Sequence, residues 1–223
     1  MSKKIVIVDY QLGNLFSVQQ ACLHLGYDAV VTSDPSVLAS ADYAILPGVG
    51  AFGDAMDNMH NLDLVEPLKD FIASGKPFMG VCLGLQLLFT ESDEFGSTKG
   101  MNLIEGVVKK FSPKNTEGGT LKVPQIAWNQ ITESKSNSWA ETPLQTCKNG
   151  DFMYFVHSYY VQPDTDDVVL STTNYGGYEY CSAIIKDNIF ACQFHPEKSS
   201  LEGINIYNNW INHHINNTSV SFL

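Results

Sequence analysis

The sequence predicts an α/β protein with a doubly wound, mostly parallel sheet, flanking helices and a β-rich second half. The first part of the chain alternates short apolar runs with longer stretches of helical spacing, which is typical of strand–helix units in parallel sheets. The later part has short β-rich runs separated by turn residues. One amphipathic stretch, residues 199–215, predicts a final helix.

Short apolar runs predict the strands of the first half. These strands are residues 4–9, 28–32, 43–46 and 77–81. Residues 14–25 carry apolar side chains at helical spacing, and Gly26 ends this predicted helix. Residues 51–74 predict a helix in two pieces, broken near Asn61 and by Pro67. This alternation predicts parallel strands with helices on both faces of the sheet.

β-rich runs dominate the second half. The predicted strands there are residues 106–111, 124–130, 152–156, 168–172, 178–185 and 189–193. Residues 132–150 are polar and are expected to form a loop, and residues 216–223 are expected to be a frayed tail. The sequence contains no repeat, low-complexity segment or linker, so we expect one domain over residues 1–223.

Composition and charge exclude several classes of function. The 223 residues include 24 acidic and 13 basic side chains, a net charge of −11, so neither nucleic acid nor an anionic membrane is an expected partner. No apolar run reaches transmembrane length, and the run between Lys4 and Asp9 is too short for a signal peptide. The five cysteines form no CxxC pair, which predicts free thiols in the cytoplasm, no metal site and no cofactor.

Cys82 lies at the turn between a predicted strand and a predicted helix. Residues 77–81 form the strand, and residues 83–89 place leucines on one helical stripe. Gly80 and Gly84 flank the cysteine, which is the pattern of a nucleophile elbow with Cys in place of Ser. The N-terminus of the helix would favour a thiolate and a developing oxyanion. A buried structural cysteine is the alternative.

A nucleophilic cysteine needs a base, and the base needs a group that orients it. His195 follows another predicted strand, and the working residues of open α/β sheets gather at the carboxyl ends of strands. Glu197 lies two residues further on, where a carboxylate can accept the second imidazole N–H. Cys82, His195 and Glu197 therefore predict a thiol acyl-transfer site. The alternative for His195 is a capping or core histidine.

Acyl transfer also needs hydrogen-bond donors for the oxyanion. Pro47-Gly48-Val49-Gly50 follows an apolar strand, and its glycines permit backbone orientations that other residues resist. The N–H groups of Val49 and Gly50, with that of Leu83 after the nucleophile, are the candidate oxyanion hole. The alternative for this loop is an ordinary turn.

Two motifs together resemble a known family. Gly80-Val81-Cys82-Leu83-Gly84-Leu85-Gln86 and Phe194-His195-Pro196-Glu197 are similar to motifs of the class I (triad) glutamine amidotransferases, whose fold is flavodoxin-like. Within that family, further segments resemble the glutaminase subunits of imidazole glycerol phosphate synthases, and this resemblance runs nearly end to end. These segments are Val8-Asp9-Tyr10, Gly13-Asn14-Leu15, Ser17-Val18, 46–53, Trp128-Asn129 and 154–159.

The resemblance implies a glutaminase. Cys82 would attack the side-chain amide of glutamine and form a glutamyl thioester, His195 would shuttle protons, Glu197 would orient His195, and water would release glutamate. The ammonia would pass to a (β/α)8 cyclase partner in a heterodimer, which makes imidazole glycerol phosphate and aminoimidazole carboxamide ribotide in histidine biosynthesis. The positions implied to hold glutamine are Gly48, Gln86, Glu94, Ser158 and Tyr159. The positions implied to face the partner are Asn14, Trp128, Tyr154 and Lys198.

Two residues depart from the family pattern, and other functions stay open. Gln11 and Ala127 both stand where the family usually has Gly. They keep open a paralogous glutaminase subunit that feeds ammonia to a sugar amidotransferase in surface-polysaccharide biosynthesis. A binding protein that kept the fold and lost catalysis is a third hypothesis, against which the intact triad argues. A simple cysteine hydrolase would share the triad, but Gln86, Glu94 and the loop of residues 47–50 fit glutamine better.

Overall fold

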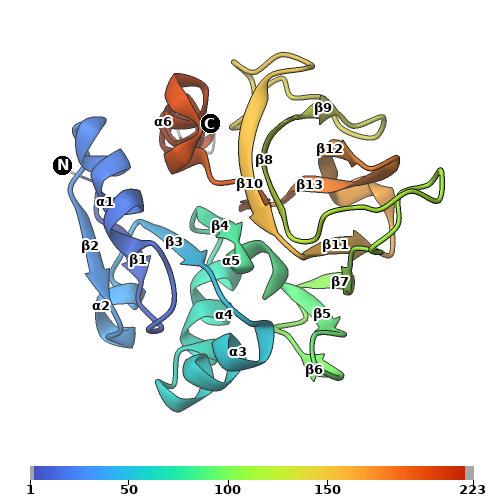
Figure 1. Cartoon of the computed structure of the whole chain (residues 1–223). Coiled ribbons are helices and arrows are strands. Elements are labelled where there is room, and N and C mark those ends of the chain that lie inside the picture. Colours follow the sequence, from blue (N-terminus) through green and yellow to red (C-terminus); the bar gives the residue numbers. More distant parts are fainter. Residues whose placement is uncertain (1–2, 219–223) are drawn as a thin grey trace.

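A computed structural model describes residues 3–218, of which residues 213–218 are described by their backbone alone (Figure 1). The helices are α1 (Leu15–His24), α2 (Pro35–Ala39), α3 (Phe52–Asn61), α4 (Val65–Ala73), α5 (Leu83–Gln86) and α6 (Ser200–Thr218), with 3₁₀ turns η1 (Asp166–Val168) and η2 (Pro196–Lys198). The strands are β1 (Ile5–Val8), β2 (Ala29–Thr32), β3 (Tyr43–Gly48), β4 (Phe78–Cys82), β5 (Phe89–Ser92), β6 (Thr98–Lys99), β7 (Ile104–Lys110), β8 (Gln125–Gln130), β9 (Thr132–Glu133), β10 (Phe152–His157), β11 (Tyr159–Pro163), β12 (Val169–Tyr175), β13 (Tyr178–Lys186) and β14 (Ile189–Cys192).

The strands form one large mixed sheet and one small sheet. The large sheet has the order β2-β1-β3-β4-β14-β13-β11-β7-β5-β6, with β12 and β9 attached beyond β13. From β2 to β14 all neighbours are parallel, which confirms the predicted fold class. The strands that join after β14 are mainly antiparallel, as in β13–β14 and β11–β7. β8 and β10 form a separate antiparallel pair.

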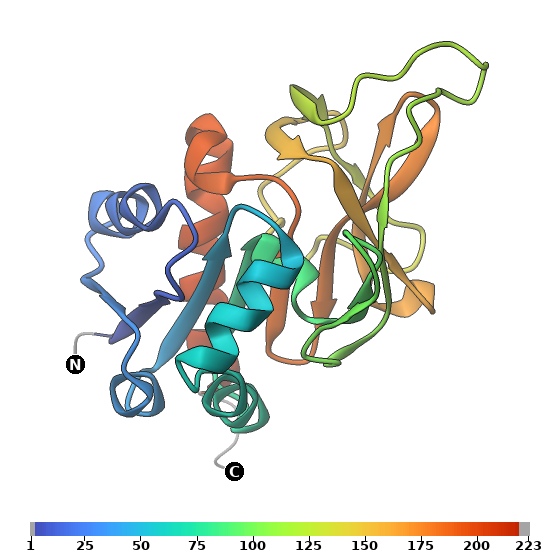
Figure 2. The same cartoon turned by 60° about the horizontal axis from the view of Figure 1, so that its bottom comes forward.

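Helices cover both faces of the parallel strands, so the sheet is doubly wound. One core cluster contains apolar side chains of α2, α3 and α4, such as Leu38, Met59 and Phe71. The other contains those of α1 and α6, such as Val18 and Trp210. Figure 2 shows α3 in front of the sheet and α6 behind it. The central strands are apolar on both sides because both faces are buried; every residue of β1 is buried.

The strand register brings the predicted site residues to one edge. In β3 and β4, Gly48 lies opposite Cys82, so the Val49-Gly50 loop leaves the sheet beside the nucleophile. In β4 and β14, Val81 lies opposite Cys192, so the segment carrying His195 leaves the same edge on the other side. The carboxyl ends of β3, β4 and β14 therefore bound one site.

Several elements differ from the sequence-based prediction. The helix predicted over residues 83–89 ends at Gln86, because the carbonyls of Leu87 and Leu88 accept hydrogen bonds from Met101 and Leu103 instead. Pro67 lies in the first turn of α4 and does not break a helix. The helix α2 and the strand β11 were not predicted. The helix α6 continues to Thr218, and the rest of the predicted frayed tail, residues 219–223, lies outside the described residues.

The part of the chain that the structure describes shows neither a membrane-spanning helix nor a cluster of metal-ligating side chains. None of the helices within residues 3–218 is both long and apolar enough to span a membrane. Among the side chains that the structure describes, no group of three or more His, Cys, Asp or Glu is placed to hold a metal ion.

Candidate active site

The backbone at Cys82 makes the sharp turn that the elbow pattern predicts. Cys82 ends β4 with φ 55° and ψ −107°, a conformation that non-glycine residues rarely adopt. Gly84 makes the turn sterically possible, because a Cβ there would lie 1.8 Å from the carbonyl O of Leu46. Gly80 is similar, since its Cβ would lie 2.9 Å from the carbonyl O of Gly84. The two glycines thus let α5 approach β3 and β4 closely enough to place the thiol at the carboxyl edge of the sheet, beside the cavity.

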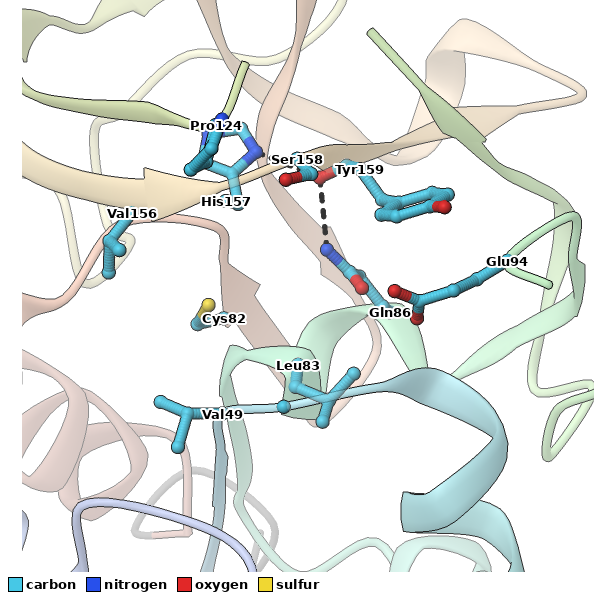
Figure 3. Close-up of a pocket in the computed structure, with 11 residues that line it drawn as sticks. Val49, Cys82, Leu83, Gln86, Glu94, Pro124, Val156, His157, Ser158 and Tyr159 are labelled. Atoms are coloured by element: carbon cyan, nitrogen blue, oxygen red, sulfur yellow. Dashed lines mark hydrogen bonds between the residues drawn. The ribbon is translucent and has the colours of Figure 1, made fainter.

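A cavity of about 240 Å³ opens at Cys82 (Figure 3). Its volume is slightly below the usual range for sites that bind drug-sized ligands, so it suits a small molecule. Cys82 lies toward one end and Glu94 toward the other, and the walls come from the β3–α3 loop and α5 on one side and the β10–β11 junction on the other. The lining residues are Val49, Gly50, Cys82, Leu83, Gln86, Glu94, Pro124, Val156, His157, Ser158 and Tyr159.

His195 and Glu197 do not line this cavity, although His195 is adjacent to Cys82. Nδ1 of His195 is 2.8 Å from Oε1 of Glu197, and both side chains are almost fully buried. Because a carboxylate only accepts hydrogen bonds, Nδ1 carries a proton. The second oxygen, Oε2, faces the hydroxyl of Tyr207 in α6 at 3.5 Å. Glu197 therefore fixes the imidazole so that Nε2 is the nitrogen available to the thiol side.

The charge state of His195 depends on Cys82 and Glu197. Burial lowers the pKa of His195, but the adjacent Cys82 and then Glu197 raise it, and the net pKa is about 10. None of the described residues gives Nε2 of His195 a hydrogen bond of regular geometry, although Cys82 is close enough to be the largest influence that raises the pKa. Catalytic hydrogen bonds are often poorly aligned before substrate binds. The arrangement favours the imidazolium form of His195 beside Cys82.

The backbone of His195 is held from both sides. Its N–H donates to the carbonyl O of Tyr154 at 2.9 Å, and its carbonyl O accepts from the Ser199 hydroxyl at 2.6 Å. The same Ser199 oxygen accepts from the N–H of Tyr154 at 3.0 Å. Gly203 in α6 lets the helix pack against η2, because a Cβ there would lie 2.1 Å from the carbonyl O of Pro196. These contacts fix the segment that carries both His195 and the orienting carboxylate.

The predicted oxyanion donors lie at the wall of the cavity beside Cys82. Val49 and Gly50 line it from the loop after β3, and Leu83 lines it from the start of α5. The N–H groups of Val49 and Gly50 donate to no other described residue, so they are available to a ligand. Gly48 does not line the cavity and packs beneath it, where its missing Cβ leaves room for the hydroxyl of Tyr10 at 1.9 Å from that position.

Gln86 and Glu94 lie at the far end of the cavity, with the Glu94 carboxylate pointing toward Gln86 (Figure 3). Nε2 of Gln86 donates to the carbonyl O of Tyr159 at 3.1 Å, which leaves its Oε1 to face the cavity as an acceptor. Oε2 of Glu94 accepts from the N–H of Phe52, the first residue of α3, at 2.6 Å. Burial raises the pKa of Glu94, and the Phe52 N–H and Lys110 partly oppose this shift. The two acceptors suit a cationic group.

The wall opposite Cys82 is fixed by a buried histidine. Nδ1 of His157 is 2.8 Å from the carbonyl O of Tyr159, so Nδ1 carries the proton, and Nε2 faces the hydroxyl of Tyr180 at 3.3 Å. Burial lowers the pKa of His157 to about 4, which keeps the ring neutral near pH 7. The carbonyl O of Ser158 accepts from the N–H of Phe111 at 3.0 Å. Ser158 and Tyr159 thus line the cavity on a rigid backbone.

Three of the four residues expected to face a partner lie in one exposed cluster. Trp128 in β8 lies opposite Tyr154 in β10, with ring centroids 6.1 Å apart, and Trp128 is 48% exposed. Nζ of Lys198 lies 5.9 Å from the centroid of the Tyr154 ring. We call Trp128, Tyr154 and Lys198 the aromatic cluster. Asn14 precedes α1, a helix that packs against η2.

The structure explains one of the two departures from the family pattern. Gln11 has φ 70°, in the left-handed region where glycine is favoured, and its N–H donates to Oδ1 of Asp9 at 2.8 Å. Glutamine at this position is therefore tolerated at a conformational cost. Ala127 is exposed in β8, opposite Phe155, and its backbone conformation does not require glycine.

Sequence reasoning missed residues that complete the site. Gln193 is fully buried, and its Nε2 lies 3.5 Å from Sγ of Cys82. Its position two residues before His195 is the available signal, because alternate residues of an extended segment face the same side. Pro124 and Val156 line the cavity without any chemical signature in the sequence. Tyr10 carries a buried hydroxyl that no described residue pairs, and its pKa is raised by burial and by Cys82.

The site places a thiol on a strained elbow and a histidine beside a buried carboxylate, an arrangement suited to acyl transfer. The sequence model of the family described as glutamine amidotransferase class-I matches residues 6–213. The chain belongs to the class-I glutamine amidotransferase family.

Individual relatives are similar over most of their length. A protein of Syntrophotalea carbinolica named imidazole glycerol phosphate synthase subunit HisH is 49% identical over 208 residues, which cover 92% of this chain and 98% of that protein. A protein of Geobacter sulfurreducens with the same name is 47% identical over 209 residues, 93% of this chain and 97% of that protein. The solved structure of PurLQS from Thermotoga maritima shares the fold, with a TM-score of 0.72 at 18% identity over 96% of this chain and 100% of that chain.

Proposed function

We propose that this chain is the glutaminase subunit of an imidazole glycerol phosphate synthase, acting in histidine biosynthesis. The relatives named as subunits of that synthase are 49% and 47% identical to it and are matched almost completely. The observation that carries the chemical part is the cavity that joins Cys82 at one end to the acceptors of Gln86 and Glu94 at the other. This distribution suits an α-amino acid whose side-chain amide must reach a thiolate.

Hydrolysis proceeds in two acyl-transfer steps. The Cys82 thiolate adds to the side-chain amide carbon of glutamine, and the oxyanion takes hydrogen bonds from the amides of Leu83 and of the Val49-Gly50 loop. The His195 imidazolium gives its Nε2 proton to the leaving nitrogen, and ammonia departs from a glutamyl thioester. Neutral His195 then takes a proton from water, which attacks the thioester and releases glutamate and the thiol. Glu197 keeps the proton on Nδ1 throughout.

Glutamine is held by its α-carbon end. Its ammonium faces Oε1 of Gln86 and the carboxylate of Glu94, where charge-assisted hydrogen bonds are strong. Its carboxylate faces the backbone of Ser158 and Tyr159 at the β10–β11 junction. Gly48 contributes indirectly. Because it has no side chain, the chain can pass beneath the cavity from β3 into the Val49-Gly50 loop.

Ammonia passes to a (β/α)8 cyclase subunit in a heterodimer, which forms imidazole glycerol phosphate and aminoimidazole carboxamide ribotide. The aromatic cluster and Asn14 face that subunit. The cluster suits this role because it combines an exposed Trp128 ring and a half-buried Tyr154 ring with one cation, and because the carbonyl O of Tyr154 accepts the backbone hydrogen bond of His195. We further propose that the chain is one cytoplasmic domain. The names of the relatives favour the histidine pathway over a sugar amidotransferase.

The test is Cys82→Ala in the complex with the cyclase of the same cell. We expect glutamine-dependent synthesis to disappear while synthesis from added ammonia continues, because the cyclase does not need the thiol. Cys147→Ala is the matched control, since Cys147 is half-buried outside the site. Loss of both activities would make Cys82 structural. A chain that never hydrolyses glutamine with the cyclase present would overturn the proposal.

The partner surface is tested separately with Lys198→Ala. We expect this variant to reduce the stimulation of glutamine hydrolysis by the cyclase and to leave the hydrolysis by the isolated chain nearly unchanged. Equal losses in the isolated chain and in the complex would contradict the placement of Lys198 at the interface. Co-purification with a sugar amidotransferase instead of the cyclase would replace the histidine pathway with the other one.

A further inference from the structure

Gln193 is a buried amide beside the nucleophile that the two acyl-transfer steps do not use. It follows β14 and is 0% exposed. Its Nε2 is 3.5 Å from Sγ of Cys82, and its Oε1 accepts from Nε2 of Gln86 at 3.0 Å. Gln193 therefore connects the nucleophile directly to a residue at the glutamine end of the cavity.

The orientation of the Gln193 amide follows from its neighbours. Nε2 of Gln86 faces the carbonyl O of Tyr159, and a carbonyl can only accept. The nitrogen of Gln86 must therefore be on that side, and Gln193 must present its oxygen to it. The nitrogen of Gln193 then points at Cys82, where its N–H donates to the sulfur. Exchanging the oxygen and nitrogen of either amide would break at least one of the three contacts, which are Gln86–Tyr159, Gln86–Gln193 and Gln193–Cys82.

The far end of this chain of amides is also rigid. The carbonyl O of Tyr159 accepts both from Gln86 and from Nδ1 of His157. His157 is buried and neutral near pH 7, so it does not change its hydrogen bonding in that range. The backbone N–H of Gln193 donates to the carbonyl O of Ser182 at 2.9 Å, which fixes the other side of the residue. The sulfur of Cys82 is thus held by a network anchored on two strands.

We propose that Gln193 is a positioning residue for Cys82. Its N–H holds the thiolate toward the cavity and links the position of the sulfur to that of Gln86, which contacts the ammonium end of glutamine. A donor to an anionic sulfur favours the thiolate over the thiol. Gln193 does not line the cavity and so acts through Cys82 and Gln86 rather than on the substrate. This role deepens the proposed glutaminase function and rests on Cys82 being its nucleophile.

The test compares Gln193→Met with Gln193→Glu. Methionine keeps the length of the side chain and removes the donor, whereas glutamate keeps the shape and places an acceptor beside the sulfur. The matched control is Gln19→Met, because Gln19 is half-buried in α1 and, among the described residues, its Nε2 donates to the carbonyl O of Ala29 alone. Folding is checked by circular dichroism. The first readout is the rate at which iodoacetamide alkylates Cys82 between pH 5 and 10, followed by mass spectrometry of the Cys82 peptide.

We expect alkylation of Cys82 near neutral pH to be about 10-fold slower in Gln193→Met, with its midpoint about one pH unit higher, and slower still in Gln193→Glu. In the complex with the cyclase, kcat for glutamine falls by a similar factor with a smaller change in KM. A folded variant with the alkylation profile of the native chain would overturn the proposal. The alkylation needs neither glutamine nor the cyclase, so it decides the role of Gln193 even if the chain proves not to be a glutaminase.

Discussion

Replacing Glu197 by glutamine removes the charge that faces His195 and keeps the shape of the side chain. The rise of the His195 pKa from its ordinary 6.5 to about 10 corresponds to about 5 kcal/mol in favour of the imidazolium, with Cys82 and then Glu197 as its causes. Because Glu197 is the smaller of these influences, its share is that of one hydrogen bond to a charged group, about 1.5–3 kcal/mol. We therefore expect kcat for glutamine hydrolysis to fall by about 10- to 150-fold in Glu197→Gln.

The assay is glutamate release by the complex with the cyclase between pH 5 and 10. KM should change little, because neither His195 nor Glu197 lines the cavity. The alkaline limit of kcat should move to lower pH, since the imidazolium loses the charge that holds its proton. Glu202→Gln, an exposed neighbour in α6, is the control. A fall of less than threefold with an unchanged pH profile would refute the role of Glu197, and a rise in KM alone would place it in glutamine binding.

Other substitutions test the buried histidine and the glycine positions. Burial lowers the pKa of His157 from 6.5 to about 4, so between these pH values the unfolded state binds more protons than the folded state. The free energy of unfolding should therefore fall by about 3 kcal/mol as the pH falls from 6.5 to 4. Urea unfolding of His157→Gln should show a shallower loss between pH 6.5 and 4; an equally steep one would contradict this. Gly203→Ala should destabilise the protein by about 1–3 kcal/mol in thermal unfolding, because the new Cβ clashes with Pro196, although alanine favours helices. Gly53→Ala is the control in the same assay. Its new Cβ would lie 3.8 Å from the nearest atom, so it should be neutral or stabilising. Gln11→Gly should raise the free energy of unfolding by up to about 1 kcal/mol, because glycine adopts the left-handed φ of 70° without strain. A lower free energy of unfolding would mean that the Gln11 side chain itself stabilises the fold.

The parallel half of the fold was predictable because its elements are locally encoded. The fully buried strands β1 and β4 are apolar throughout, and α1 ends where Gly26 predicts. The unpredicted β11 depends on distant pairing, since only Ser158 separates it from β10 and the two strands join different sheets. The helix after Cys82 was predicted too long for the same reason: its last leucines are bonded to a loop more than ten residues away.

The candidate site was predictable where chemistry needs a rare residue in a particular place. A cysteine between spaced glycines and a histidine followed by a carboxylate have recognisable patterns, and the resemblance to a family added Gln86 and Glu94. Gln193 could not be assigned, because a buried glutamine has no chemical signature without its neighbours. Its role depends on which end of the amide faces Cys82, and only the contact between Gln86 and Tyr159 decides that.

The Glu94 carboxylate both lines the cavity and accepts a hydrogen bond from Phe52 at the start of α3. Oε2 of Glu94 accepts from the first N–H of α3, and only Ala51 separates α3 from the Val49-Gly50 loop. A substitution of Glu94 therefore cannot be a pure affinity variant, since it also frees the start of the helix that anchors this loop. Kinetic defects in such variants have to be divided between weaker glutamine binding and a displaced loop before either is attributed to Glu94.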